Sequence, residues 1–139
     1  MTERELDPKS GIKISQLVVT TEDKVGMLSE VSQAISETDV NIEAINAYGL
    51  EGKAKFYIIT SENQKVIPAL KTKGWQVEEE EVVRIDLENK IGALSQIGTK
   101  LKSAGVNLLY CYGTVSEGAS PCRFILKAED NDKAIEALG

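Results

Sequence analysis

The stretch Asp23–Leu28, which reads DKVGML, decides the fold because the chain contains it twice. Asn89–Leu94 reads NKIGAL, and Gly26 and Gly92 set the offset between the two stretches at 66 residues. The offset also relates further pairs: Ser29 with Ser95, Val31 with Ile97, Ile35 with Leu101, Val40 with Val106 and Asn41 with Asn107. A repeat that keeps its glycine, its apolar helix positions and its asparagine indicates a duplicated structural unit.

Length and composition favour small packed domains. The chain has 139 residues, of which 42% are hydrophobic and 27% charged, as in globular proteins. Domains of about 60–70 residues bury only about 60% of their unfolded surface, so we expect the copies to pack on each other and on a second chain, as a homodimer. No apolar run approaches the roughly 20 residues that span a bilayer, and the polar N-terminus is no signal peptide. We therefore expect a cytoplasmic protein.

Charge and residue usage exclude several classes of function. The net charge of −6 and the pI of about 4.8 argue against nucleic acid and anionic membrane as partners. The chain has no histidine, the commonest general base and metal ligand. Cys111 and Cys122 form no C-x-x-C pair. Arg4, Arg84 and Arg123 lie outside both repeated loops, which disfavours an acylphosphatase-type enzyme. We expect no catalytic residue, metal site or cofactor.

The first copy has alternating strand and helix patterns. Leu28, Val31 and Ile35 lie on one face of a helix that opens at Gly26. The other predicted elements are a strand over 12–21, a hairpin of strands 41–48 and 54–60 with a five-residue connection, a second helix that ends at Lys73, and a strand over 75–77. The order β-α-β-β-α-β is the ferredoxin-like unit, an antiparallel sheet with its helices on one face.

The second copy repeats this order over strand 82–87, helix 92–103, strand 107–112, a turn through Gly118, strand 122–127 and helix 132–138. Its fourth strand is missing, so either the sequence is cut short or another segment covers that sheet edge. Glu78–Glu81 joins the copies without glycine or proline, so the flanking strands should run into each other. The predicted fold is α+β with two tandem modules: residues 1–11 are a flexible tail, 12–80 the first module and 81–139 the second.

The Asp/Asn-Lys-x-Gly loop, the leucine two residues later and the Val-Asn pair that opens the next strand resemble the ACT domain, here as a tandem pair. The family commonly has proline before the glycine, whereas Val25 and Ile91 stand there and leave the loop less constrained. The resemblance implies an amino-acid sensor that binds its ligand where modules meet and shifts the assembly of modules or partners. It also implies an amino-acid-metabolism enzyme or regulator as partner.

The predicted site suits a zwitterion. Free N–H groups at a helix N-terminus favour a carboxylate, glycine allows close approach, and an asparagine side chain can bind an ammonium or a carboxylate. Asp23 could contact the ligand or cap the helix, and Asn89 in its place makes the second site different. The candidate residues are Asp23, Val25, Gly26, Met27, Leu28, Asn41 and Ile42 in the first copy, and Asn89, Ile91, Gly92, Ala93, Leu94, Asn107 and Leu108 in the second.

Two alternatives remain open. A protein-interaction module of the same fold would bind no ligand, and the groove at Gly26 would then be filled by side chains. A nucleic-acid module would need basic and aromatic residues on strand faces. Tyr110 and Tyr112 share a face, but the 16 lysines and arginines are outnumbered by 22 acidic residues.

Overall fold

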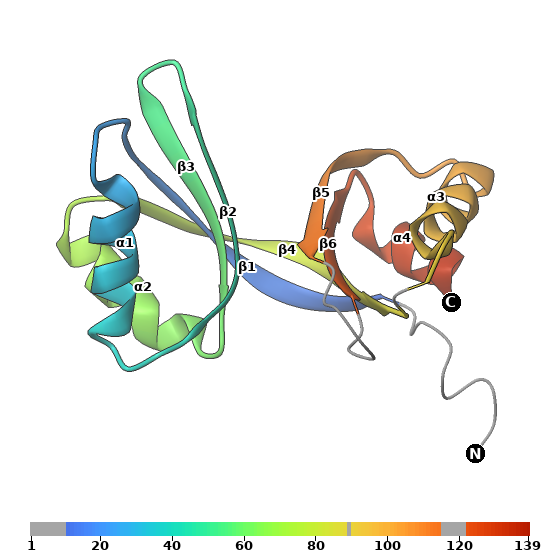
Figure 1. Cartoon of the computed structure of the whole chain (residues 1–139), viewed down its shortest axis with the longest axis horizontal. Coiled ribbons are helices and arrows are strands. Elements are labelled where there is room, and N and C mark those ends of the chain that lie inside the picture. The colour runs from blue at the N-terminus through green and yellow to red at the C-terminus, as the bar shows by residue number, and fades with distance from the viewer. Residues whose placement is uncertain (1–10, 89, 115–121) are drawn as a thin grey trace. The chain divides into compact units, whose positions relative to one another are not determined.

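The computed structural model describes residues 11–88, 90–114 and 122–139. These residues form an α+β arrangement (Figure 1), as predicted. The elements in chain order are β1 (Ile12–Glu22), α1 (Met27–Ser36), β2 (Ile42–Leu50), β3 (Lys53–Thr60), α2 (Asn63–Thr72), β4 (Gln76–Leu87), α3 (Ala93–Ser103), β5 (Leu108–Thr114), β6 (Cys122–Ala128) and α4 (Asn131–Leu138).

The chain divides into two compact units. The first is Ser15–Glu80, and the second combines residues 11–14 with the described part of 81–139. Strands β1 and β4 therefore each contribute residues to both units. The sequence analysis placed residues 12–14 with the first copy, whereas the structure groups them with the second. Residues 1–10 of the expected tail lie outside the described residues.

The first unit is an antiparallel sheet in the order β2-β3-β1-β4, with α1 and α2 on one face (Figure 1). Alternate residues of β1 and β3 point toward the helices, as the period of two in a strand requires. Val19 pairs with Phe56 across the two strands. The core formed in this way contains Leu17, Val19, Met27, Val31, Ala34, Ile35, Val40, Ala54, Phe56, Ile58, Val66 and Leu70.

The hairpin between β2 and β3 is tighter than predicted. The five-residue connection is wrong, because β2 continues to Leu50 and β3 begins at Lys53. Only Glu51 and Gly52 lie between them, and both have positive φ, 52° and 79°. Two positive φ angles are typical of the type I′ turn, whose twist matches that of the strands. Gly49 belongs to the strand and pairs with Ala54.

In the second unit, β4, β6 and β5 are antiparallel neighbours, and Figure 1 shows α3 and α4 packed together on this unit. Its core contains Val83, Ile85, Leu87, Ala93, Ile97, Leu101, Leu126, Ala128, Ala134 and Leu138. The helix residues Ile97 and Leu101 correspond to Val31 and Ile35 of the first core, as the repeat predicts. The predicted turn through Gly118 lies outside the described residues.

The start of β1 packs on the second unit. Gly11 is buried, and a Cβ at this position would collide with the side chain of Val83 and touch that of Ile135. Lys13 Nζ lies 2.9 Å from the Asp132 carboxylate. Asp132 and, more weakly, Glu81 raise the pKa of Lys13. Because the sheet has the order β1-β4-β6, residues 11–14 lie on the side of β4 opposite to β6.

The predicted direct run between the two copies is confirmed, because Gln76–Leu87 forms the single strand β4. The glutamates of β4 also form side-chain hydrogen bonds. Glu79 accepts hydrogen bonds from Ser15 Oγ at 3.2 Å and Gln64 Nε2 at 2.9 Å. Glu80 accepts one from the fully buried Gln16. These bonds attach β4 to β1 and α2 within the first unit.

Candidate ligand site at the start of helix α1

The two repeated loops adopt the same backbone conformation. Gly26 and Gly92 immediately precede α1 and α3, with left-handed φ angles of 91° and 84°. The amide of Met27 donates to the Lys24 carbonyl at 3.4 Å, and the equivalent Ala93 amide donates to Lys90 at 3.3 Å. Residues with a Cβ atom rarely adopt such a φ, so the backbone of both copies requires glycine at this position.

Each helix begins with unpaired amides. The first helical bonds run from Glu30 N to Gly26 O and from Gln96 N to Gly92 O, both at 3.0 Å. Neither helix has a side-chain cap. Within the described part of the chain, no acceptor is found for the amides of Leu28 and Ser29, nor for those of Leu94 and Ser95. These donors lie at the positive end of each helix dipole, where an anion is favoured.

Asp23 fixes the loop to the hairpin instead of capping the helix. Its amide donates to the Gly52 carbonyl at 3.0 Å. Its carboxylate lies against Gly49, where an added Cβ would collide with it. The expectation that Asp23 could cap α1 is therefore wrong, since α1 has no side-chain cap. Its counterpart Asn89 lies outside the described residues.

Asn41 and Ile42 line a cavity of about 390 Å³ beside α1. The Asn41 backbone carbonyl accepts a hydrogen bond from Ser61 N at 3.2 Å. Among the described residues, no partner is found for the Asn41 side chain. Ser29, Ser32 and Ser36 also line this cavity, so the predicted asparagine shares it with one side of α1, whereas Gly26, Met27 and Leu28 are not among its lining residues.

The sequence analysis missed the serines of this cavity, although their spacing on α1 was visible. Ser29, Ser32 and Ser36 repeat at intervals of three and four residues and therefore share one face of the helix. The Ser32 hydroxyl donates to the Ser29 carbonyl at 3.3 Å. The remaining lining residues are Gln33, Ile35 and Val40.

Two predicted site residues are buried in the cores. The side chains of Met27 and Ala93 are 4% and 6% exposed, so only their backbones could face a ligand. The neighbouring predicted residues project into solvent, with Val25 at 100% and Leu28 at 60% exposure in the first copy. Ile91 and Leu94 are similarly exposed in the second.

The asparagines of the two copies differ in their bonding. Asn107 Nδ2 donates to the Glu129 carboxylate at 2.6 Å. In the first copy, Ser61 takes the place of Glu129, because both residues donate their amides to the carbonyl of the asparagine. Leu108, the counterpart of Ile42, packs against the second core. The second copy therefore uses its asparagine internally, whereas the first does not.

Apolar side chains surround the first loop. Leu50 is 61% and Tyr48 45% exposed, and the hydrogen bond from Asp23 to Gly52 keeps their hairpin tip beside the loop that carries Val25 and Leu28. We call Val25, Leu28, Tyr48 and Leu50 the apolar rim.

Metal binding, membrane spans and disulfide formation were the other features to consider in the described part of the chain. No three His, Cys, Asp or Glu residues among the described positions lie close enough to hold a metal. None of the helices in these ranges has the length and apolar character needed to cross a membrane. Cys111 is exposed and Cys122 is buried, and both are free. Cys111 pairs with Leu126 and Cys122 with Leu87, so the two thiols do not oppose each other.

Residues 15–72 match the family model of the ACT domain. The match lies within the first unit and includes both the loop at Gly26 and the cavity at Asn41. Because ACT domains are regulatory, the match supports a ligand-binding regulatory role for this part of the chain. A search among curated proteins found no match.

Solved structures resemble the chain over most of its length. Protein BT0572 from Bacteroides thetaiotaomicron is 26% identical, with a TM-score of 0.85 over 94% of this chain and 89% of that one. The ligand-free regulatory subunit of aspartate kinase from Thermus thermophilus is 18% identical, with a TM-score of 0.64 over 96% and 91%. The regulatory subunit from Thermus flavus is 16% identical, with a TM-score of 0.60 over 95% and 96%. The last two similarities concern the fold.

Proposed function

We propose that the protein is a cytoplasmic, non-catalytic regulator built of two ACT modules that binds a free amino acid at its first module. One observation carries the proposal. Ser29, whose amide has no acceptor among the described residues, and Asn41, whose side chain has no partner among them, line the same cavity. Donors and an amide oxygen around one cavity are what the carboxylate and ammonium of a zwitterion require.

The carboxylate of the ligand would accept from the amide of Ser29, near the end of α1 where the helix dipole favours negative charge. The ammonium would donate to the Asn41 side-chain oxygen, and hydroxyls such as that of Ser32 complete the shell. Bonds between charged and neutral partners contribute about 1.5–3 kcal/mol each. Two or three of them would give binding in the micromolar to millimolar range after the cost of ordering the ligand.

The second module is proposed as a structural copy that does not bind under the same conditions. It retains the left-handed Gly92 and the amides of Leu94 and Ser95, for which no acceptor is found among the described residues. Asn107, however, is bound to Glu129, and that carboxylate would repel the carboxylate of an amino acid.

We propose that a second copy of the chain covers the ligand site in a homodimer. The apolar rim leaves Val25 and Leu50 in solvent, and burying such side chains contributes about 1.5–3 kcal/mol each. A ligand held under a homodimer interface would bind one arrangement of the modules more tightly and shift the population toward it. The resemblance in fold to regulatory subunits of aspartate kinase supports an enzyme or regulator of amino-acid metabolism as the partner that responds.

A thermal-shift screen against the twenty amino acids, followed by calorimetry, tests the proposal. We expect at least one amino acid to raise the Tm and to bind once per chain. Analytical ultracentrifugation with and without that amino acid would show whether binding changes the assembly. No response from any amino acid with folded protein would refute the sensor.

The apolar rim also favours a second candidate function, a protein-interaction module that binds no ligand. In that case the exposed Val25 and Leu28 would serve only to join chains. Val25→Ser and Leu28→Ser would then abolish assembly while no amino acid affects it, whereas the sensor predicts that the ligand and the interface are coupled.

A further inference from the structure

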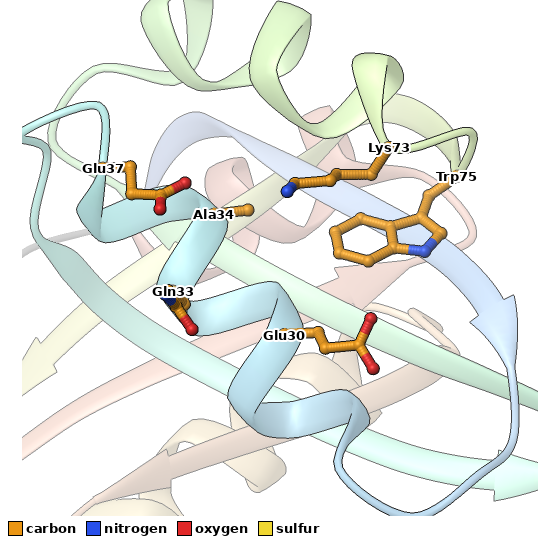
Figure 2. Close-up of a pocket in the computed structure, with 6 residues that line it drawn as sticks. All are labelled: Glu30, Gln33, Ala34, Glu37, Lys73 and Trp75. Carbon is orange, nitrogen blue, oxygen red and sulfur yellow. The ribbon is translucent and has the colours of Figure 1, made fainter.

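A second cavity of the first unit lies between α1 and the segment that follows α2. It has a volume of about 130 Å³ and is lined by Glu30, Gln33, Ala34, Glu37, Lys73 and Trp75 (Figure 2). Of these six residues, Gln33 alone also lines the cavity at Asn41. The inference below therefore does not depend on the proposed amino-acid site.

Trp75 forms the apolar wall of this cavity. Its indole packs partly against the first core and is only half-buried. In Figure 2 the indole extends from the segment after α2 toward α1, and the carboxylate of Glu30 points toward the ring from α1. An indole face is the best aromatic surface for a cation, and a carboxylate beside it adds a charge of the correct sign.

The charges at the other end of the cavity also favour a cation. Glu37 is the C-cap of α1, where the helix dipole is negative, and the last turn of α1 contains no basic residue. Lys73 extends its ammonium into the cavity toward Ala34 (Figure 2). No ion pair joins Lys73 to either glutamate among the described residues, whereas Glu30 Oε2 lies 3.9 Å from the exposed Lys24 Nζ. The lining itself contains two carboxylates and one ammonium, and Lys24, which pairs with Glu30, lies outside the lining.

We propose that this cavity binds a small monovalent organic cation, an alkylammonium or alkylguanidinium group, held by the Glu30 carboxylate against the face of Trp75. Lys73 offsets the charge of Glu37, so Glu30 and the indole are the groups that select the ligand. A single positive charge matches the net charge of the lining. An anion would meet two carboxylates, and a neutral molecule would gain only contact with the ring.

The test uses Trp75 itself, because it is the only tryptophan of the chain. The full chain, labelled with 15N at tryptophan, gives one indole N–H signal, and n-butylammonium chloride is titrated against it. Sodium butyrate and n-butanol, at the same ionic strength, are the matched anionic and neutral probes. We expect a saturable shift of the indole signal with n-butylammonium alone.

Two charge-neutralising variants test the assignment to Glu30. Glu30→Gln should weaken binding of n-butylammonium about two- to fivefold, as expected for loss of one exposed charge pair. Glu43→Gln, an exposed change in β2 outside the cavity, should leave the binding unchanged. Equal shifts with all three probes, no saturable shift with n-butylammonium, or equal effects of the two variants would overturn the proposal.

Discussion

The side-chain amide of Asn107 donates to the Glu129 carboxylate over 2.6 Å, and this bond separates two otherwise matching copies of one loop. In the first copy the equivalent amide of Asn41 has no partner among the described residues. A free amide on a cavity wall is available to a ligand, whereas one bound to a charged carboxylate must first lose a strong hydrogen bond.

The first prediction concerns these asparagines. Asn41→Ala should raise the Kd of the amino acid found in the screen about tenfold or more, because it removes a hydrogen bond to a charged group, worth about 1.5–3 kcal/mol. Asn107→Ala is the matched control and should leave the Kd unchanged. Calorimetry measures both values, and equal losses in the two variants would show that the second copy also binds.

Much of the fold could be predicted from the sequence, because the pattern of one copy could be compared with that of the other. A glycine, an apolar helix face and an asparagine that recur at one offset have to occupy the same place in two units. Gly26 and Gly92 accordingly share one left-handed conformation, and Val31 and Ile97 lie in corresponding cores. These features are local, so periodicity and turn chemistry are sufficient to predict them.

The features that the sequence did not reveal depend on contacts between distant residues. Gly11 packs against Val83, which no local pattern indicates. The bond between Asn107 and Glu129 spans a hairpin whose length the sequence leaves open. The sequence analysis places Gly49 in the turn because glycine favours turns. In the structure Gly49 belongs to β2, where it pairs with Ala54, and the Asp23 carboxylate lies against it.

The second prediction concerns the backbone at the helix starts. Gly26→Ala should destabilise the protein by about 1–2 kcal/mol, because alanine is strained at a φ of 91°. No atom lies within 4 Å of the added Cβ, so the cost is conformational and not steric. Urea denaturation measures the change in the free energy of unfolding.

Gly98→Ala is the matched control for that variant. Gly98 lies inside α3, its φ is not positive, and its added Cβ also meets no atom within 4 Å. Alanine there should stabilise the protein by about 0.5–1 kcal/mol, because glycine is a poor helix residue. Effects of the same sign in the two variants would contradict the assigned role of Gly26.

The third prediction concerns the start of β1. Gly11→Ala should destabilise the protein by about 1–3 kcal/mol, because its Cβ would overlap the buried Val83 side chain. In the double variant Gly11→Ala, Val83→Ala, the new methyl group has room. The double variant should therefore lose less stability than the two single changes predict together, with a coupling of about 0.5 kcal/mol or more. Strict additivity in urea denaturation would indicate that residue 11 does not pack against Val83.

The fourth prediction concerns Tyr57, whose ring stacks on Tyr48 at 5.8 Å and whose hydroxyl lies 3.1 Å from that of Tyr48. Burial, then the hydrogen bond with Tyr48, raises the pKa of Tyr57 to about 12. The folded state thus holds this proton more tightly than the unfolded chain, whose tyrosine pKa is about 10. The resulting contribution to stability is present below pH 10 and is lost as the pH rises toward 12.

Tyr48→Phe should lower the pKa of Tyr57, because it removes the hydrogen bond and the charge of an ionised neighbour while the ring still covers Tyr57. Phenolate absorbance followed from pH 8 to 13 measures the titration, and the final ionisation step, if it belongs to Tyr57, should move to lower pH in the variant. Leu50→Ala, on the same strand and exposed, is the control and should not alter the titration. An unchanged final step in Tyr48→Phe would mean that burial alone sets the pKa of Tyr57.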